Sequence, residues 1–161
     1  MFKYVDTLVT FEEFPDEISL CINISGCPIH CPGCHSKYLW ENDGKLLLST
    51  KLIELIDNNP GITCVGFMGG AQDTYHLLNL AILVRNKYPN LKIGWYTGQK
   101  EIPEIISNNL PEFDYIKLGP YDEKCGPLTS ETTNQVMYMI DHNSNEKLVN
   151  ITDKFWKNSH K

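Results

Sequence analysis

The chain has 161 residues, of which 42% are hydrophobic and 21% are charged, and it carries a formal net charge of −6. This length suits one domain with a hydrophobic core of its own, so we predict a single domain over residues 1–161. The acidic balance argues against broad binding to nucleic acid, and no apolar run reaches the length of a membrane span. The first residues do not resemble a secretion signal, so we expect a cytoplasmic protein with reduced thiols.

The first predicted elements are two paired strands. Along residues 17–25, isoleucine and leucine side chains alternate with small or polar ones, which is typical of a strand. Residues 3–11 are expected to pair with it as a hairpin. The face that carries Ser19, Cys21 and Asn23 is small and polar, and it suits the wall of a cavity better than a water-facing surface.

Helices and strands then alternate along the chain. A first helix is expected to begin at a Ser49 or Thr50 cap and to end before Pro60. The remaining elements predicted in this part are strand 62–67, a longer helix from an Asp73 or Thr74 cap to Pro89, strand 91–96, a short helix over 102–107 and strand 115–118.

The pattern changes after Tyr121. Residues 122–135 show no periodicity and are predicted to form an irregular loop, and its length suggests a function. The last predicted elements are a hairpin of strands 136–140 and 147–151 and a hydrophobic anchor of Phe155 and Trp156 for the C-terminus.

Alternating strands and helices indicate an α/β fold with a mostly parallel sheet, because parallel strands need a crossover between them. In such folds ligands bind beyond the carboxyl ends of the strands. Four of the predicted strands end at a glycine turn, so these turns should meet at one edge of the sheet, next to the cysteines that follow the first turn. The turns are Ser25-Gly26-Cys27, Met68-Gly69-Gly70, Thr97-Gly98-Gln99 and Leu118-Gly119-Pro120.

Three cysteines, Cys27, Cys31 and Cys34, lie close together in this loop. Three thiolates on a tight loop can hold three irons of a [4Fe–4S] cluster and leave the fourth iron open. A zinc site that adds His30 or His35 is a second interpretation, although ligands so close in sequence would cross-link little of the fold. Ordinary thiols are a third. The other cysteines are Cys21 and Cys64, which we expect to be buried and inert, and Cys125, to which we assign no role.

Two motifs carry a resemblance to a known family. The segment Cys27-Pro28-Ile29-His30-Cys31-Pro32-Gly33-Cys34 resembles the three-cysteine motif of the radical S-adenosylmethionine (SAM) enzymes, and Phe67-Met68-Gly69-Gly70 resembles their glycine-pair motif. Within this superfamily the chain is similar to the activating proteins of anaerobic ribonucleoside-triphosphate reductase in its short length, its Cys-Pro-Gly-Cys, Trp95-Tyr96-Thr97-Gly98 and Thr133-Asn134-Gln135. The resemblance implies a partial (incomplete) β/α barrel of the radical SAM type with a C-terminal hairpin.

The resemblance also implies a site. Cys27, Cys31 and Cys34 would bind a [4Fe–4S] cluster, and the open iron would bind the amino and carboxylate groups of SAM. It implies no catalytic residue beyond these three ligands. The residues implied to contact SAM are Met68, Gly69 and Gly70 at its methionyl end and Gly33, Cys34 and His35 near its adenosyl part.

The implied partners are a low-potential electron donor and the large subunit of the reductase, on which reductive cleavage of SAM would generate a glycyl radical. Neither nucleic acid nor a membrane is an expected partner, and the oligomeric state, a homodimer included, stays open. Residues 119–135 form either a docking surface for the reductase or a solvated loop. Two other functions also stay open: a radical SAM enzyme for a small molecule, and a non-catalytic module that binds zinc or an iron–sulfur cluster.

Overall fold

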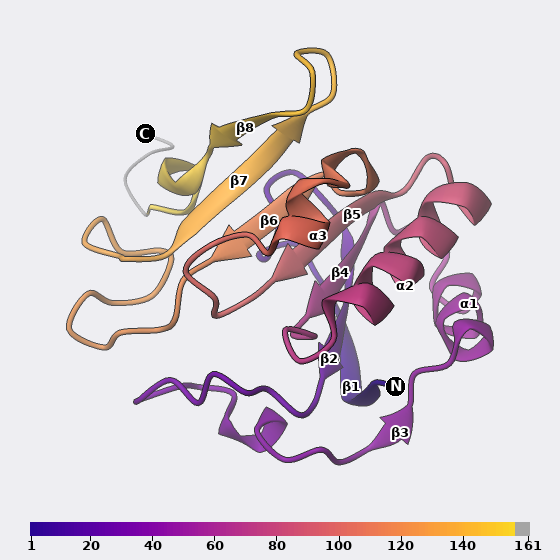
Figure 1. Ribbon diagram of the computed structural model, residues 1–161, viewed down its shortest axis with the longest axis horizontal. Coiled ribbons are helices and arrows are strands. Elements are labelled where there is room, and N and C mark those ends of the chain that lie inside the picture. The colour runs from indigo at the N-terminus through magenta and orange to yellow at the C-terminus, as the bar shows by residue number, and fades with distance from the viewer. Residues whose placement is uncertain (157–161) are drawn as a thin grey trace.

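The computed structural model describes residues 1–156, so the last five residues of the predicted domain, 157–161, lie outside the described part. Eight strands form one sheet: β1 (Lys3–Thr10), β2 (Ser19–Ile24), β3 (Lys45–Leu46), β4 (Cys64–Met68), β5 (Lys92–Tyr96), β6 (Tyr115–Leu118), β7 (Val136–Asp141) and β8 (Lys147–Asn150). Their order is β3-β1-β2-β4-β5-β6-β7-β8 (Figure 1). The neighbours β2, β4, β5 and β6 run parallel, whereas all other pairs are antiparallel.

The predicted strands are confirmed to within two residues at each end, and both predicted hairpins form. The sheet is mixed rather than mostly parallel, because the strand pairs at both of its sides, β3-β1-β2 and β6-β7-β8, are antiparallel. Strand β3 was not predicted. It has two exposed residues and depends on its pairing with Lys3 and Tyr4 of β1. The end strands of the sheet are β3 and β8, and the partial barrel stays a prediction.

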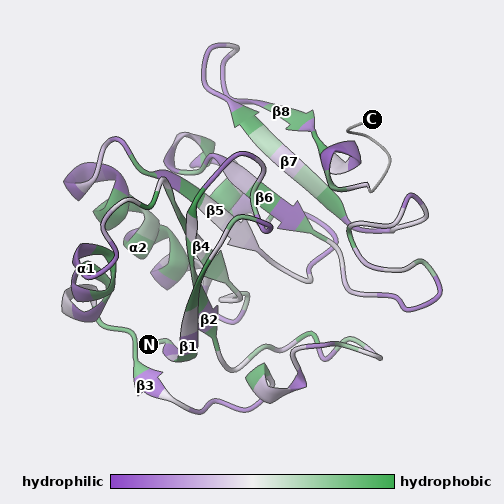
Figure 2. Ribbon diagram, turned by 180° about the vertical axis from the view of Figure 1, so that it is seen from behind, coloured by the Kyte–Doolittle hydropathy of each residue, from purple (hydrophilic) through white to green (hydrophobic). Residues whose placement is uncertain are grey.

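Three α-helices, α1 (Ser49–Asp57), α2 (Thr74–Lys87) and α3 (Glu104–Ser107), lie on one side of the sheet (Figures 1 and 2). Short 3-10 turns lie at Lys37–Leu39, Leu110–Glu112 and Thr152–Phe155. The predicted cap of the long helix is confirmed, since the Asp73 side chain accepts a hydrogen bond from the backbone N–H of His76 at 3.0 Å. The predicted cap of α1 is wrong. Its N-cap residue is Leu48, without a capping side chain, because Ser49 and Thr50 already belong to the first turn.

Side chains of the central strands alternate between two hydrophobic clusters. On one face, residues such as Ile22, Phe67 and Trp95 are fully buried and pack in the same cluster as the buried residues of the helices. The opposite face carries a smaller cluster that includes Phe14, from the loop between β1 and β2. The Phe14 ring lies so close to β5 that a Cβ atom on Gly94 would overlap it. Glycine therefore allows an aromatic ring to close this face of the sheet.

The edge of the sheet opposite the glycine turns is held by a network around Asp114, the residue before β6. Its carboxylate accepts hydrogen bonds from the backbone N–H of Ile93 at 2.8 Å and from the Arg85 guanidinium at 2.9 Å. The His142 ring bonds the second carboxylate oxygen at 2.8 Å and contacts the Glu146 carboxylate at 2.5 Å. This network fastens the turn between β7 and β8 to α2 and β5.

Candidate functional site

The four glycine turns meet at the carboxyl ends of the parallel strands, as predicted. The Gln72 side-chain amide, after the Gly69-Gly70 turn, donates to the carbonyl of Ser25 at 2.8 Å. A Cβ atom on Gly98 would lie 3.0 Å from the side chain of Ile29 in the cysteine loop. The turns after β4 and β5 therefore contact the end of β2 and the loop that follows it.

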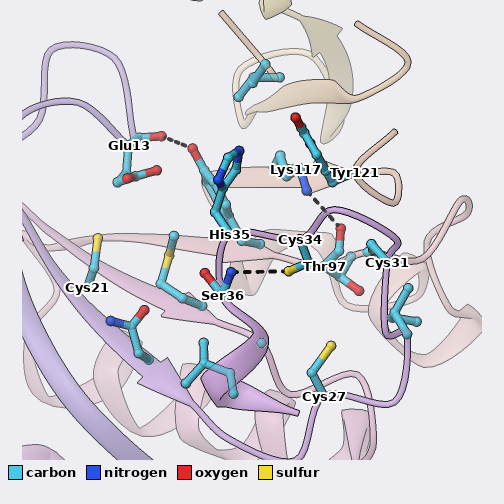
Figure 3. A pocket seen from close by; sticks show the side chains of 18 of the residues that line it. Glu13, Cys21, Cys27, Cys31, Cys34, His35, Ser36, Thr97, Lys117 and Tyr121 are labelled. Atoms are coloured by element: carbon cyan, nitrogen blue, oxygen red, sulfur yellow. Dashed lines mark hydrogen bonds between the residues drawn. The ribbon is translucent and has the colours of Figure 1, made fainter. Parts of the chain in front are cut away.

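A cavity of about 580 Å³ opens between these turns, and Cys27, Cys31 and Cys34 all line it (Figure 3). The polar face of β2 also lines it through Cys21 and Asn23, which confirms that this face forms a cavity wall. The predicted cluster ligands are thus brought to one cavity by a loop of eight residues. Cys31 is the most buried of the three, at 8% exposure.

The cysteine loop curls tightly. The backbone N–H of Cys34 donates to the carbonyl of Cys31 at 3.1 Å, and the backbone N–H of Ser36 donates to the Cys34 sulfur at 3.3 Å. All three thiols are free. Soft thiolates without a disulfide partner suit an iron–sulfur cluster, and a backbone N–H on the sulfur is one of the contacts that tune such clusters.

The zinc interpretation gains no support from this geometry. Within residues 1–156, no three histidine, cysteine or acidic side chains come close enough to hold a single metal ion.

The glycine pair borders the same cavity, together with Met68. Gly69 and Gly70 have φ angles of +114° and +102°, and a Cβ atom on Gly69 would lie 2.9 Å from the carbonyl of Ile24. The Gly69 N–H donates to the carbonyl of Tyr96 at 3.1 Å, and its carbonyl accepts from the Trp95 indole at 2.9 Å. Since both of its backbone groups have partners, Gly69 shapes the cavity by its conformation and lack of a side chain.

The residues predicted to lie near the adenosyl part of SAM are found in two different places. Cys34 and His35 line the cavity, and the His35 ring lies 5.1 Å from the Tyr121 ring. Gly33 faces the loop after β6, because a Cβ atom there would lie 3.0 Å from the Glu123 carboxylate and 3.4 Å from the Tyr121 ring. The small residue at position 33 therefore lets the two loops pack closely.

His30 has a role that the sequence did not reveal. It is exposed and has a φ angle of +51°, and its ring stacks on Trp40 with centroids 4.4 Å apart and planes 8° from parallel. Trp40 lines the cavity, and its indole N–H is buried without a hydrogen-bond partner in the described part of the chain. His30 therefore braces the cysteine loop, and Trp40 holds a donor that a bound molecule can use.

Lys117 is a second residue that sequence reasoning missed. It lies in β6, is only 8% exposed and lines the cavity (Figure 3). Burial lowers the pKa of its ammonium group to about 8, against the negative charges of Cys31 and Cys34, which raise it. The signal in the sequence was a lysine inside a strand whose other three residues are apolar.

The other cysteines behave as predicted where the structure tests them. Cys21 and Cys64 are buried, at 3% and 0% exposure. Burial, with a smaller contribution from Glu13, raises the pKa of Cys21 to about 12, and burial also raises the pKa of Cys64, so both stay protonated thiols. Cys21 points into the cavity from β2, apart from the three cysteines of the loop (Figure 3). Cys125 is half-buried in the loop after β6.

Residues 122–135 form an irregular loop, as predicted, and part of this loop forms a wall of the cavity. Pro127, Leu128 and Thr129 line the cavity, and Leu128 is buried in the cluster around Phe14. The side chains of Asn134 and Gln135 donate to carbonyls at the β6 turn, at 3.1 and 3.3 Å. A role in docking stays a prediction.

Comparisons with known proteins identify the kind of domain. Residues 18–123, about two thirds of the chain, match the family described as a 4Fe-4S single cluster domain. The matched range contains β2, the cysteine loop, the glycine pair and Lys117. Searches of curated proteins and of solved structures found no match. Among residues 1–156, no helix has both the length and the apolar character needed to cross a bilayer. Because the matched range covers well over half of the sequence, the chain belongs to the 4Fe-4S single cluster domain family.

Proposed function

We propose that this chain is a radical SAM activating enzyme, which cleaves SAM reductively at its [4Fe–4S] cluster and generates a glycyl radical on anaerobic ribonucleoside-triphosphate reductase. The observation that carries the proposal is the shared cavity of Cys27, Cys31, Cys34 and the Gly69-Gly70 turn. A cluster held by three cysteines would keep one iron open, and the glycine pair lines the same cavity as these cysteines.

The cofactors would supply the radical chemistry, in which one electron from a reductant would convert SAM into methionine and a 5′-deoxyadenosyl radical, and this radical would take a hydrogen atom from a glycine of the reductase. The chain itself would bind, orient and shield. Cys27, Cys31 and Cys34 would hold the cluster, and the Ser36 N–H on the Cys34 sulfur would stabilise negative charge on that ligand.

The glycine pair would let the main chain turn closely past the end of β2, since its φ angles of +114° and +102° suit glycine, and the turn would then lie along the methionyl end of SAM. His35 and Tyr121, whose rings lie 5.1 Å apart on the cavity, would offer planar surfaces to the adenosyl part. The buried N–H of Trp40 would supply a donor from the side of the cysteine loop. The neighbouring loop, with Leu128 buried against the sheet, would limit the entry of water that quenches radicals.

The first test measures cluster assembly and SAM cleavage. The protein is reconstituted without oxygen with iron and sulfide, reduced, mixed with SAM, and analysed by electron paramagnetic resonance (EPR) and for 5′-deoxyadenosine. We expect about four irons per chain, a signal that changes with SAM, and formation of 5′-deoxyadenosine. Cys31→Ala should lose the cluster and the product, whereas Cys125→Ala, the removal of a thiol outside the three-cysteine loop, should retain both. A protein that binds only zinc, or a cluster that never cleaves SAM, would refute the proposal.

The second test identifies the partner. The large reductase subunit is added to the reduced enzyme with SAM, and the doublet of a glycyl radical is sought by EPR. We expect the radical with the wild-type enzyme and none with Cys31→Ala. If 5′-deoxyadenosine forms but no radical appears on the reductase, the SAM-cleaving activity stands and the assignment of this partner is wrong.

A further inference from the structure

Lys117 is a buried cation whose position the proposed chemistry does not yet use. Its side chain extends from β6 to the face of the sheet that forms the cavity, and it is 8% exposed. The ammonium group donates to the carbonyls of Gly119 at 3.1 Å and Thr97 at 3.4 Å and lies 5.5 Å from the centre of the Tyr96 ring. Lys117 is thus held in one place by two strand ends and an aromatic ring.

Lys117 forms no ion pair with a carboxylate in the described part of the chain, and the Glu13 carboxylate on the same cavity acts on it only from a longer distance. Among residues 1–156 the ion pairs involve Lys51, Arg85 and His142, and none includes Lys117. A buried ammonium without a charged partner is unfavourable, since carbonyls and an aromatic face replace only part of its hydration. Such a group usually indicates that an anion belongs nearby.

The cysteine loop offers that anion. Cys31 and Cys34 lie on the same cavity as Lys117 (Figure 3), and as thiolates they would favour its ammonium form, together with Glu13 and Cys27. Thiolates that carry an iron–sulfur cluster are negative, and the cluster gains one more negative charge when it is reduced. A fixed positive charge at this position therefore favours the reduced form over the oxidised one.

We propose that the Lys117 ammonium is a positioning charge that raises the reduction potential of the cluster bound by Cys27, Cys31 and Cys34. Lys117 would act through space on a one-electron step, in which an external reductant such as dithionite gives one electron to the cluster and no covalent bond forms or breaks. Charges and hydrogen bonds around an iron–sulfur cluster tune its reduction potential. Lys117 is a buried cation that lines this cavity. This inference rests on the proposed cluster site.

The test is a reductive titration of the cluster, followed by EPR at pH 7 and without SAM. The principal variant is Lys117→Gln, whose neutral amide can still donate to the two carbonyls. Lys117→Met provides a second neutral side chain if the first variant does not fold, and Lys117→Arg restores the charge. Lys92→Gln is the matched control, because it removes the same charge from an exposed residue at the start of β5.

We expect both neutral variants to bind as much iron as the wild type, with a reduced fraction about tenfold smaller relative to the oxidised one at a fixed potential. For a one-electron couple this corresponds to a fall of about 59 mV. Lys117→Arg and Lys92→Gln should titrate close to the wild type.

The outcomes separate the inference from the proposed function. Neutral variants that bind the cluster and titrate like Lys92→Gln would overturn the inference and leave the cluster site intact. A change that appears only after SAM is added would also overturn it, because Lys117 would then act on SAM. A wild-type protein that assembles no four-iron cluster would overturn the proposed function, and the inference with it.

Discussion

The two ends of the parallel strands are stabilised in different ways. At the amino ends, Asp114 joins Arg85, Ile93 and His142 in one network of hydrogen bonds at 2.8 to 2.9 Å. At the carboxyl ends, glycine turns and the cysteine loop surround a cavity of about 580 Å³ and are joined by hydrogen bonds between uncharged groups, such as Gln72 to the carbonyl of Ser25 at 2.8 Å and the N–H of Gly69 to the carbonyl of Tyr96 at 3.1 Å. The buried network at the amino ends stabilises the fold away from the cavity, since none of its four residues lines it. This difference teaches that the stability of the fold and the candidate site depend on separate residues at the two ends of the strands.

The largest expected effect on stability is at Asp114. Asp114→Asn removes the charge that pairs with Arg85, and loss of one partner of a buried ion pair costs 3–5 kcal/mol. Because the Arg85 side chain is 23% exposed, we expect the lower end, about 3 kcal/mol, as measured by urea unfolding of the apoprotein. Iron bound per folded chain should not change.

Glu54→Gln is the matched control for Asp114→Asn. It removes one charge from the pair of Lys51 and Glu54, where the Glu54 side chain is 56% exposed, and should cost less than about 1 kcal/mol. If the two variants had similar stability, or if Asp114→Asn lost the cluster before it lost its fold, the contrast between the two ends would be wrong.

A second test adds a methyl group to β5, midway between the two ends of the parallel strands, where the sheet packs against Phe14. Gly94→Ala would place a Cβ atom in the ring of Phe14, and overpacking of this kind costs about 1–3 kcal/mol. Phe14→Leu should remove part of this cost, so the free energies of unfolding of the two single variants should not add up to that of the double variant. Additive values would show that Gly94 and Phe14 do not constrain each other.

The alkaline stability of the apoprotein tests the cavity wall. The pKa of Cys21 is about 12 in the folded chain and 9.0 ordinarily, so the unfolded chain releases this proton first as the pH rises. The stabilising contribution of the protonated thiol is complete below pH 9 and is lost progressively up to pH 12. At pH 10 the loss should be about 1.4 kcal/mol relative to neutral pH, since one pH unit corresponds to 1.36 kcal/mol.

The measurement for this prediction is urea unfolding at pH 8 and pH 10 under a reducing agent, for the wild type and for Cys21→Ala. The variant should lose less stability between the two pH values than the wild type. Equal losses would mean that burial in β2 does not raise the pKa of the Cys21 thiol.

The sequence predicted most of what depends on local pattern. Alternation placed β2, and Asp73 marked the start of α2, because these signals involve neighbouring residues. The convergence of the glycine turns also followed, since parallel strands must end at one edge. It did not predict that Ser49 would fall inside its helix, because hydroxyl residues suit both a cap and the first turn.

What the sequence could not predict depends on contacts between distant residues. Lys117 reads as a surface lysine until the strand order places it between β5 and β7, facing the cysteine loop. Asp114 and His142 are 28 residues apart and meet only through the pairing of β6 with β7. The three cysteines were different, because their spacing within one loop held the chemical signal locally.

The smallest expected effect on stability is at His30, and it tests the other side of the comparison. His30→Ala removes a ring stacked on Trp40, and an aromatic pair contributes about 0.5–1.5 kcal/mol beyond the area that it buries. Because His30 is exposed, the apoprotein should lose only about 0.5 kcal/mol, the lower limit of that range. The reconstituted variant should nevertheless lose iron to a chelator faster than the wild type, since the stacked ring holds the loop that carries Cys31.

His30→Phe keeps a planar ring at the same position and should release iron at nearly the wild-type rate. A large loss of apoprotein stability in His30→Ala, with no change in iron release, would show that the loop supports the fold rather than the cluster.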